Sequence, residues 1–122
     1  MSSQVVSIVD DDDGARFATA SLVRSLGWRA RAFASAEEFL DSGLLGETSF
    51  LISDIQMPGL SGIEMHDRLL GLGYAIPTIF ITAFSTAALK AEILAKGAPA
   101  FLEKPVDATT VERLLKFALG TP

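Results

Sequence analysis

Five side chains that can take part in chemistry stand at, or just beyond, the ends of short apolar runs in this 122-residue chain. They are Asp10, Asp11, Asp54, Thr82 and Lys104. Carboxylates held close together repel one another unless a cation or a proton neutralises them. Hard oxygen ligands select Mg²⁺, which keeps several waters and takes only one or two carboxylates. If the fold gathers these side chains, they can form a Mg²⁺ site with a lysine beside it.

The same groups suit the transfer of a phosphoryl group to a carboxylate. Asp54 would be the nucleophile and would form an acyl phosphate. Lys104 would bind one phosphoryl oxygen as a point charge, and Thr82 can donate a hydrogen bond to another. A bound Mg²⁺ would screen the incoming negative charge. Little more is required, because phosphoryl transfer depends mainly on positioning and electrostatic stabilisation.

The elements that must position these residues alternate between strand and helix. Short apolar runs predict strands over residues 5–9, 28–33, 50–54, 77–82 and 99–102. Helical spacing predicts a helix after each strand, the fourth over about 86–96. This alternation predicts a single doubly wound (βα)5 domain of the α/β class, with a five-stranded parallel sheet in the order 2-1-3-4-5. Strands one, three, four and five are then neighbours, so the reactive side chains would share one edge of the sheet.

The predicted helices have apolar faces that should pack against the sheet. The expected inward residues are Ala15, Thr19, Leu22 and Leu26 in the first helix, Phe39 and Leu40 in the second, Ile63, Leu69 and Leu70 in the third, and Val111, Leu114, Leu115 and Ala118 in the last. His66 has no partner at metal-ligand spacing and is expected at the surface. Asp12 and Asp13 suit the start of the first helix, where acidic side chains are favourable.

Composition excludes several classes of protein. The chain has no cysteine, so disulfides and thiolate metal sites are excluded. Its net charge of −5 argues against direct nucleic-acid binding, which needs a basic surface. No signal peptide is visible, and every apolar stretch is far shorter than the ~20 residues of a membrane helix. We therefore expect a cytoplasmic protein that does not contact a membrane.

Four segments together resemble the receiver domain of two-component response regulators, in particular its FixJ-like branch. They are Ile8–Asp12, Asp54–Gly62, Ile79–Ala83 and Phe101–Pro105, in this order and at this spacing. The resemblance extends over residues 5–119. It implies a regulatory phosphoacceptor, which is not an enzyme beyond catalysing its own phosphorylation and dephosphorylation. We accordingly expect residues 1–122 to form one receiver domain, with no output domain in this chain.

The resemblance implies roles for the acidic residues. Asp54 would accept the phosphoryl group. Asp11, Asp54 and the backbone carbonyl of Gln56 would bind Mg²⁺ (or Mn²⁺) directly, and Asp10 would act mainly through a metal-bound water. Gln56 and Phe84 stand at positions that tune the lifetime of the acyl phosphate in the family.

The resemblance also implies a switch. Lys104 would pair with Asp54 or with the phosphoryl group, and the Lys104–Pro105 bond is expected to be cis. Thr82 would move toward a phosphoryl oxygen, and Phe101 would turn inward with it.

A partner would read this change on the face made by the fourth helix, the fifth strand and the fifth helix. Candidate residues of that face are Lys90, Leu94 and Pro99. The implied partners are a cognate histidine kinase as phosphodonor and an output domain or downstream protein, with control of transcription as the expected output. Homodimerisation through the same face is compatible with the resemblance.

Three other functions share parts of this pattern. A haloacid-dehalogenase-type phosphatase needs a second aspartate two residues after the nucleophile, where this chain has Gln56. A flavodoxin-like cofactor binder needs a Ser/Thr/Gly-rich phosphate cradle after the first strand, where residues 10–13 are all aspartate. The main alternative is a degenerate receiver that acts only as a protein-interaction module, although every expected site residue is retained.

Overall fold

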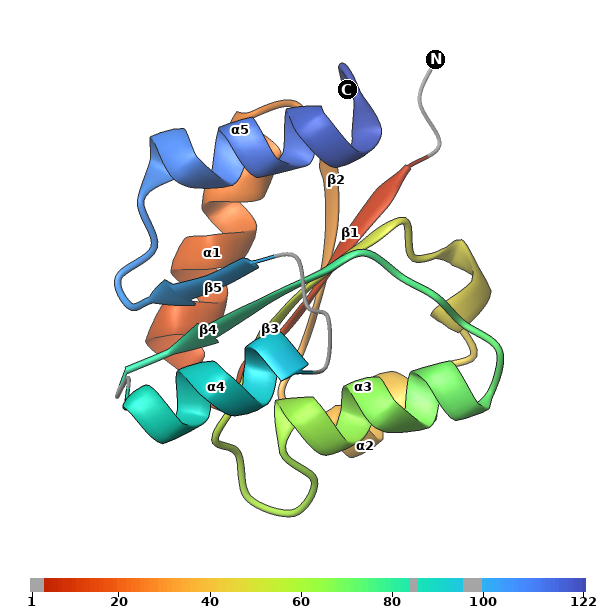
Figure 1. The fold of residues 1–122 in the computed structure, drawn as a ribbon. Coiled ribbons are helices and arrows are strands. Elements are labelled where there is room, and N and C mark those ends of the chain that lie inside the picture. Colours follow the sequence, from red (N-terminus) through yellow and green to blue (C-terminus); the bar gives the residue numbers. More distant parts are fainter. Residues whose placement is uncertain (1–3, 84–85, 96–99) are drawn as a thin grey trace.

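The computed structural model describes residues 4–83, 86–95 and 100–122, in which strands and helices alternate (Figure 1). The strands are β1 (Val5–Val9), β2 (Arg29–Phe33), β3 (Phe50–Asp54), β4 (Thr78–Thr82) and β5 (Ala100–Glu103). The helices are α1 (Asp13–Ser25), α2 (Ala36–Leu40), α3 (Gly62–Gly71), α4 (Ala87–Ala95) and α5 (Ala108–Leu119), with a 3-10 turn, η1 (Leu45–Glu47), before β3. No helix in these residues is long and apolar enough to cross a membrane.

The sheet is parallel throughout, and its order is β2-β1-β3-β4-β5, as expected. All residues of β1, β3 and β4 are buried, because helices cover both faces of the sheet. Strands buried on both faces are continuous apolar runs, which explains the runs in the sequence. The edge strand β2 is largely exposed and carries Arg29 and Arg31. The strands that lead into Asp10, Asp54 and Thr82 therefore lie in the buried middle of the sheet, and β5, which leads into Lys104, is the other edge strand.

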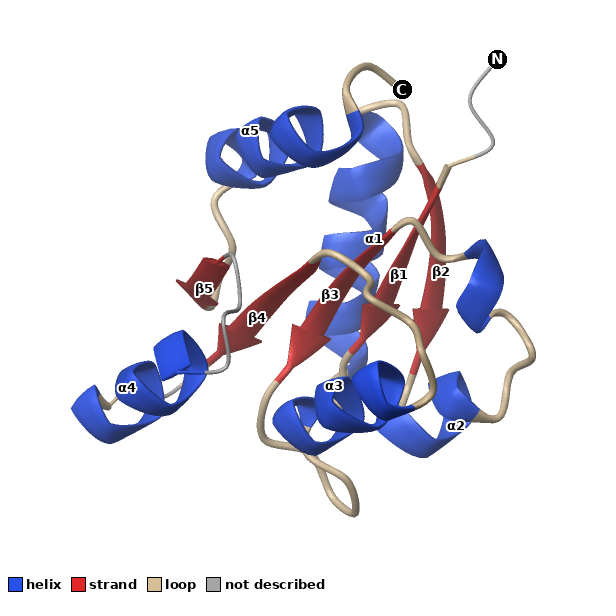
Figure 2. Ribbon diagram, turned by 45° about the vertical axis from the view of Figure 1, so that its right-hand side comes forward, coloured by secondary structure: helices blue, strands red, loops and turns tan. Residues whose placement is uncertain are grey.

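Helices form two layers around the sheet, with α1 and α5 on one face and α2, α3 and α4 on the other (Figures 1 and 2). On the first face, Val23 of α1 and Leu115 of α5 share a core cluster with Ile8 and Ile52 of the central strands. On the second face, α2 and α3 pack over Leu51. This sandwich holds the carboxyl ends of the strands in fixed positions relative to one another.

The predicted face of α1 is confirmed in part. Thr19 is buried as expected, but the rest of the buried stripe is Ala20 and Val23. Leu22 and Leu26 are half-buried and pack against the core cluster, and Ala15 is half-buried beside a cavity that Leu22 also lines. In α2 and α5 the prediction is confirmed at Phe39, Val111 and Leu115, which are buried. Leu40 and Leu114 are half-buried. Ala118 is exposed, so the prediction is wrong there.

Two predictions for α3 are also wrong. Leu70 is 49% exposed, because Met65 and Leu69, four residues apart, already define the inward stripe. His66 was expected at the surface but is 8% exposed. Its ring meets the ring of Phe80 edge-on, with centroids 5.5 Å apart. The helix turns this histidine toward β4, so spacing to other ligands was a poor guide to its burial.

Candidate functional site

The register of the sheet brings the site together. Val9 pairs with Ser53, so the next residues in β1 and β3, Asp10 and Asp54, lie side by side. On the other side of Asp54, β4 ends in the fully buried Thr82. The backbone N–H of Lys104 donates to the carbonyl of Thr82 at 2.8 Å, which extends the pairing of β4 and β5 to the site. Four strand ends thus meet at one edge, as the sequence predicted.

Three carboxylates gather at this edge. One oxygen from each of Asp10, Asp11 and Asp54 lies within 4.8 Å of the other two. Asp10 is fully buried and Asp54 is 6% exposed, whereas Asp11 is open to solvent. The cluster therefore has two buried carboxylates, and its third carboxylate is at the protein surface.

Lys104 binds both inner carboxylates. Its Nζ lies 2.9 Å from Oδ2 of Asp10 and 3.4 Å from Oδ2 of Asp54, so its nearer partner is Asp10. The peptide bond to Pro105 is cis, as expected. Burial alone would lower the pKa of Lys104, but the hydrogen bond to Asp10 and the charges of both aspartates outweigh it and raise the pKa. Lys104 is therefore a permanent cation at the site.

One lysine does not balance the cluster. Burial first, and then the charge of Asp10, raise the pKa of Asp54 to about 6, although Lys104 opposes the shift. Oδ1 of Asp54 accepts a hydrogen bond from the N–H of Ile55 at 2.9 Å. Oδ2 of Asp10, although ion-paired with Lys104, accepts no hydrogen bond of good geometry. Three carboxylates that share one lysine keep an excess of negative charge, which fits a hard divalent cation such as Mg²⁺.

The turn from β3 into α3 depends on Gly62. A Cβ at this residue would collide with the carbonyl oxygen of Asp54 and lie 2.9 Å from Oγ of Ser53. The N–H of Gly62 donates to the carbonyl of Ile55 at 2.8 Å. Ser61 caps the helix, and Glu64 completes a capping box. The start of α3 is thus packed directly against the backbone of Asp54, and exposed Gln56 lies in the loop between them.

The turn from β1 into α1 orients Asp10. Its Oδ1 accepts the N–H of Asp12 at 3.0 Å, and Asp12 caps α1, which confirms its expected place at the helix start. The guanidinium of Arg16 donates to the carbonyl of Asp10 at 2.9 Å. Sequence reasoning missed Arg16, because no spacing rule links a helix residue to a carbonyl six residues earlier.

Of the two expected switch residues, Thr82 ends β4 at the site, and Phe101 lies in β5. Phe101 is half-buried and packs against a cluster that includes Phe80 of β4 and Ile93 of α4. Lys90 and Leu94 of α4 are exposed, as a partner surface requires. The predictions for Phe84 and Pro99 lie outside the described residues.

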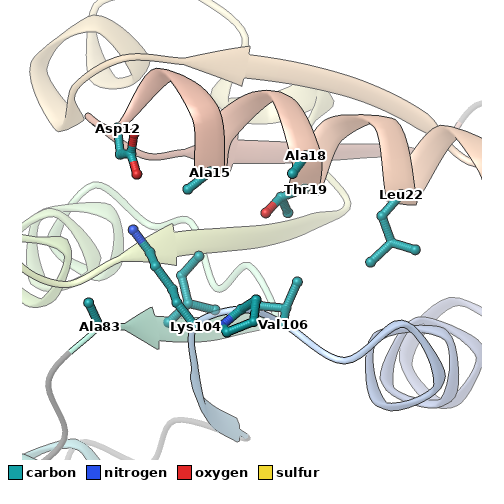
Figure 3. A pocket seen from close by; sticks show the side chains of 10 residues that line it. Asp12, Ala15, Ala18, Thr19, Leu22, Ala83, Lys104 and Val106 are labelled. Carbon is teal, nitrogen blue, oxygen red and sulfur yellow. The ribbon is translucent and has the colours of Figure 1, made fainter.

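A cavity of about 410 Å³ opens next to Lys104 (Figure 3). It lies between α1 and the segment that follows β5. The lining is mostly apolar and includes Ala15, Ala18 and Leu22 from α1 and Val106 beyond β5. The cavity borders the site at Lys104, and none of the three clustered carboxylates lines it.

Comparison with known proteins agrees with this geometry. The family described as "Response regulator receiver domain" matches residues 6–116. The transcriptional regulatory protein FixJ of Azorhizobium caulinodans is 34% identical over 115 residues, which are 94% of this chain and 54% of that protein. The response regulator protein TmoT of Ectopseudomonas mendocina is 41% identical over 102 residues, which are 83% of this chain and 46% of that protein.

A solved structure gives the same result. The crystal structure of FixJ-N superposes with a TM-score of 0.83 at 31% identity, covering 97% of this chain and 94% of that one. The chain spans about half the length of FixJ and TmoT. Matching fold, matching sequence and the strand-end cluster lead to one conclusion. This chain belongs to the response regulator receiver domain family.

Proposed function

We propose that Asp54 accepts a phosphoryl group from a histidine kinase in a Mg²⁺-dependent reaction. The observation that carries this proposal is the convergence of three carboxylates and one lysine at the end of the parallel sheet. Buried charge is costly, and a module that served only as a docking surface would not need it. The cluster therefore favours a phosphoacceptor over a degenerate receiver.

In the proposed step, a carboxylate oxygen of Asp54 attacks the phosphorus of the donor. An O–P bond forms, and the bond to the kinase's histidine nitrogen breaks, with the electron pair leaving on the imidazole. A pKa of about 6 leaves Asp54 mostly ionised at neutral pH, so the nucleophile is available. Lys104, whose Nζ is 3.4 Å from Asp54, would bind one phosphoryl oxygen, and Thr82 would donate a hydrogen bond to another.

Asp11, Asp54 and the backbone carbonyl of Gln56 would hold Mg²⁺ (or Mn²⁺), with Asp10 acting through a bound water. The ion would supply positive charge next to the transferred group. Gln56 is exposed two residues after Asp54, where it would lie near the acyl phosphate and influence its hydrolysis.

The output would follow from Thr82 and Phe101 moving inward. Phe101 packs in the same cluster as Ile93, so a turn of its ring changes the packing of α4. The proposed reading surface is the face formed by α4, β5 and α5, which would bind an output domain, a downstream protein or a second copy of the chain. FixJ is named as a transcriptional regulator, and we propose transcription control as the final output.

The direct test is intact-mass measurement after incubation with acetyl phosphate and Mg²⁺. We expect a gain of one phosphoryl group that is lost with EDTA and in Asp54→Asn. The exposed Asp41→Asn makes the same change of charge elsewhere and should be phosphorylated like the wild type. Absence of any gain with small donors and with a kinase would support the degenerate receiver instead.

A further inference from the structure

Glu37 of α2 contacts the loop that joins β3 to α3, although the two are distant in sequence. Its Oε2 accepts a hydrogen bond from the backbone N–H of Leu60 at 3.0 Å. Gly59 packs so tightly on this carboxylate that a Cβ there would collide with Oε2. The φ of Gly59 is 76°, so the backbone conformation also favours glycine. Two consecutive residues of the loop thus lie against one side chain from a different helix.

The same loop is attached at two other points. Met57 is 9% exposed and packs into the cluster that contains Phe39 of α2. Ile55 is buried, and its carbonyl accepts the N–H of Gly62. Gln56 lies between these buried neighbours. The position of its carbonyl is therefore set by the path of the loop as a whole.

We propose that Glu37 is a positioning residue for the metal site, which holds the loop over residues 57–61 so that the Gln56 carbonyl stands ready to bind Mg²⁺. This inference rests on the proposed function, since it gives the loop carbonyl a role as a ligand. Its physical basis is preorganisation: a loop ordered before binding loses less conformational entropy when the ion binds.

The charge of Glu37 suits this role. The hydrogen bond from Leu60 lowers the pKa of Glu37, and the positive charge of Arg68 on α3 lowers it further. The side chain is therefore a carboxylate at neutral pH, and hydrogen bonds to a charged acceptor are stronger than neutral ones. The neighbouring Glu38 carries the same charge on the same helix and is exposed like Glu37, with its backbone N–H bonded to Ser35.

The test compares wild type, Glu37→Ala, Glu37→Gln and Glu38→Ala by two measurements. The first is hydrogen exchange of the Leu60 amide without metal, followed by NMR. The second is the dissociation constant for Mg²⁺ alone, from calorimetry. In Glu37→Ala we expect Leu60 to exchange about tenfold faster and Mg²⁺ to bind roughly threefold more weakly or worse. Glu37→Gln keeps an oxygen acceptor but loses the charge, so it should recover only part of both losses, whereas Glu38→Ala should match the wild type.

The inference requires both changes in Glu37→Ala. If Mg²⁺ affinity or Leu60 exchange stays at the wild-type value, the inference is wrong while the proposed function stands. An equal loss of affinity in Glu38→Ala would show that charge matters rather than position, and would also overturn it. A wild type that does not bind Mg²⁺ would instead reject the metal-dependent function, and this inference with it.

Discussion

The helices α3 and α4 lie on the same face of the sheet but differ in how firmly they are held (Figure 2). Helix α3 begins with a capping box and buries five residues, among them Ile63, Met65 and Leu69. Helix α4 buries Ile93 alone among its described residues, and its Leu94 is 74% exposed. Helix α3 is therefore part of the buried framework of the domain, by which we mean the sheet and the helices packed firmly on it, whereas α4 is held by few buried contacts.

This difference fits the proposed roles, in which α3 positions the site and α4 transmits a change. Burying a large apolar side chain contributes roughly 1.5–3 kcal/mol, so three such residues hold α3 far more firmly than one holds α4. Helix α3 follows directly from the Asp54 strand, where movement would disturb the carboxylates. Helix α4 shares a core cluster with Phe101 through Ile93 and Leu89, and the proposed switch would move it at low cost.

The strongest way to break the framework is Gly62→Ala. The added Cβ would collide with the carbonyl of Asp54, so either α3 or the end of β3 must shift. We expect the free energy of unfolding in urea to fall by about 3 kcal/mol or more, and phosphorylation to be lost. Gly71→Ala, in the same helix, meets no atom within 4 Å and should be neutral or slightly stabilising. Equal effects at the two glycines would contradict the packing described here.

Truncating one buried residue in each helix compares them directly. Leu69→Ala should lower the free energy of unfolding by about 2–5 kcal/mol, because its surroundings are fixed on every side. Ile93→Ala should cost roughly 2 kcal/mol or less, since α4 can settle into the space. Denaturant titrations give both numbers. A larger loss at Ile93 would mean that α4 belongs to the framework.

The pH dependence of stability measures the charge imbalance at the end of β3. The folded-state pKa of Asp54 is raised to about 6 from 3.8, so between these values the folded state holds more protons than the unfolded state. Stability without metal should therefore decrease as the pH rises from about 4 to about 6, and then level off. Asp54→Asn should remove this decrease and stabilise the protein by about 2 kcal/mol at pH 7, with little change at pH 4. Thermal melts across this pH range would show it, and an unchanged pH profile would contradict it.

The smallest expected change in stability is that of Thr82→Ala, about 1 kcal/mol. This variant tests the response to phosphorylation. Mass measurement should still show that Thr82→Ala is phosphorylated by acetyl phosphate. In the wild type, NMR shifts on phosphorylation should be larger in α4 and Phe101 than in α3, and Thr82→Ala should reduce the α4 shifts. If the variant responds like the wild type, the coupling through Thr82 is wrong.

The topology and the strand-end cluster could be predicted because both follow from local patterns. Apolar runs mark the strands, alternation makes them parallel, and parallel strands place Asp10, Asp54 and Lys104 at one edge. The side of each helix that faces the core was harder to predict. Hydrophobic spacing shows that a segment is helical but indicates only weakly which residues point inward, as Leu70 and His66 show. The contact between Glu37 and Leu60 had no local signal at all, since it depends on how α2 packs beside a loop 23 residues later.

The ion pair between Lys104 and Asp10 joins residues 94 positions apart. During synthesis on the ribosome, the three carboxylates are made long before their lysine, and the cation arrives only when β5 adds to the sheet. A chain still lacking β5 would hold the carboxylates without the lysine proposed to bind a phosphoryl oxygen. Competence to be phosphorylated would then report completed folding, so that unfinished chains would send no signal.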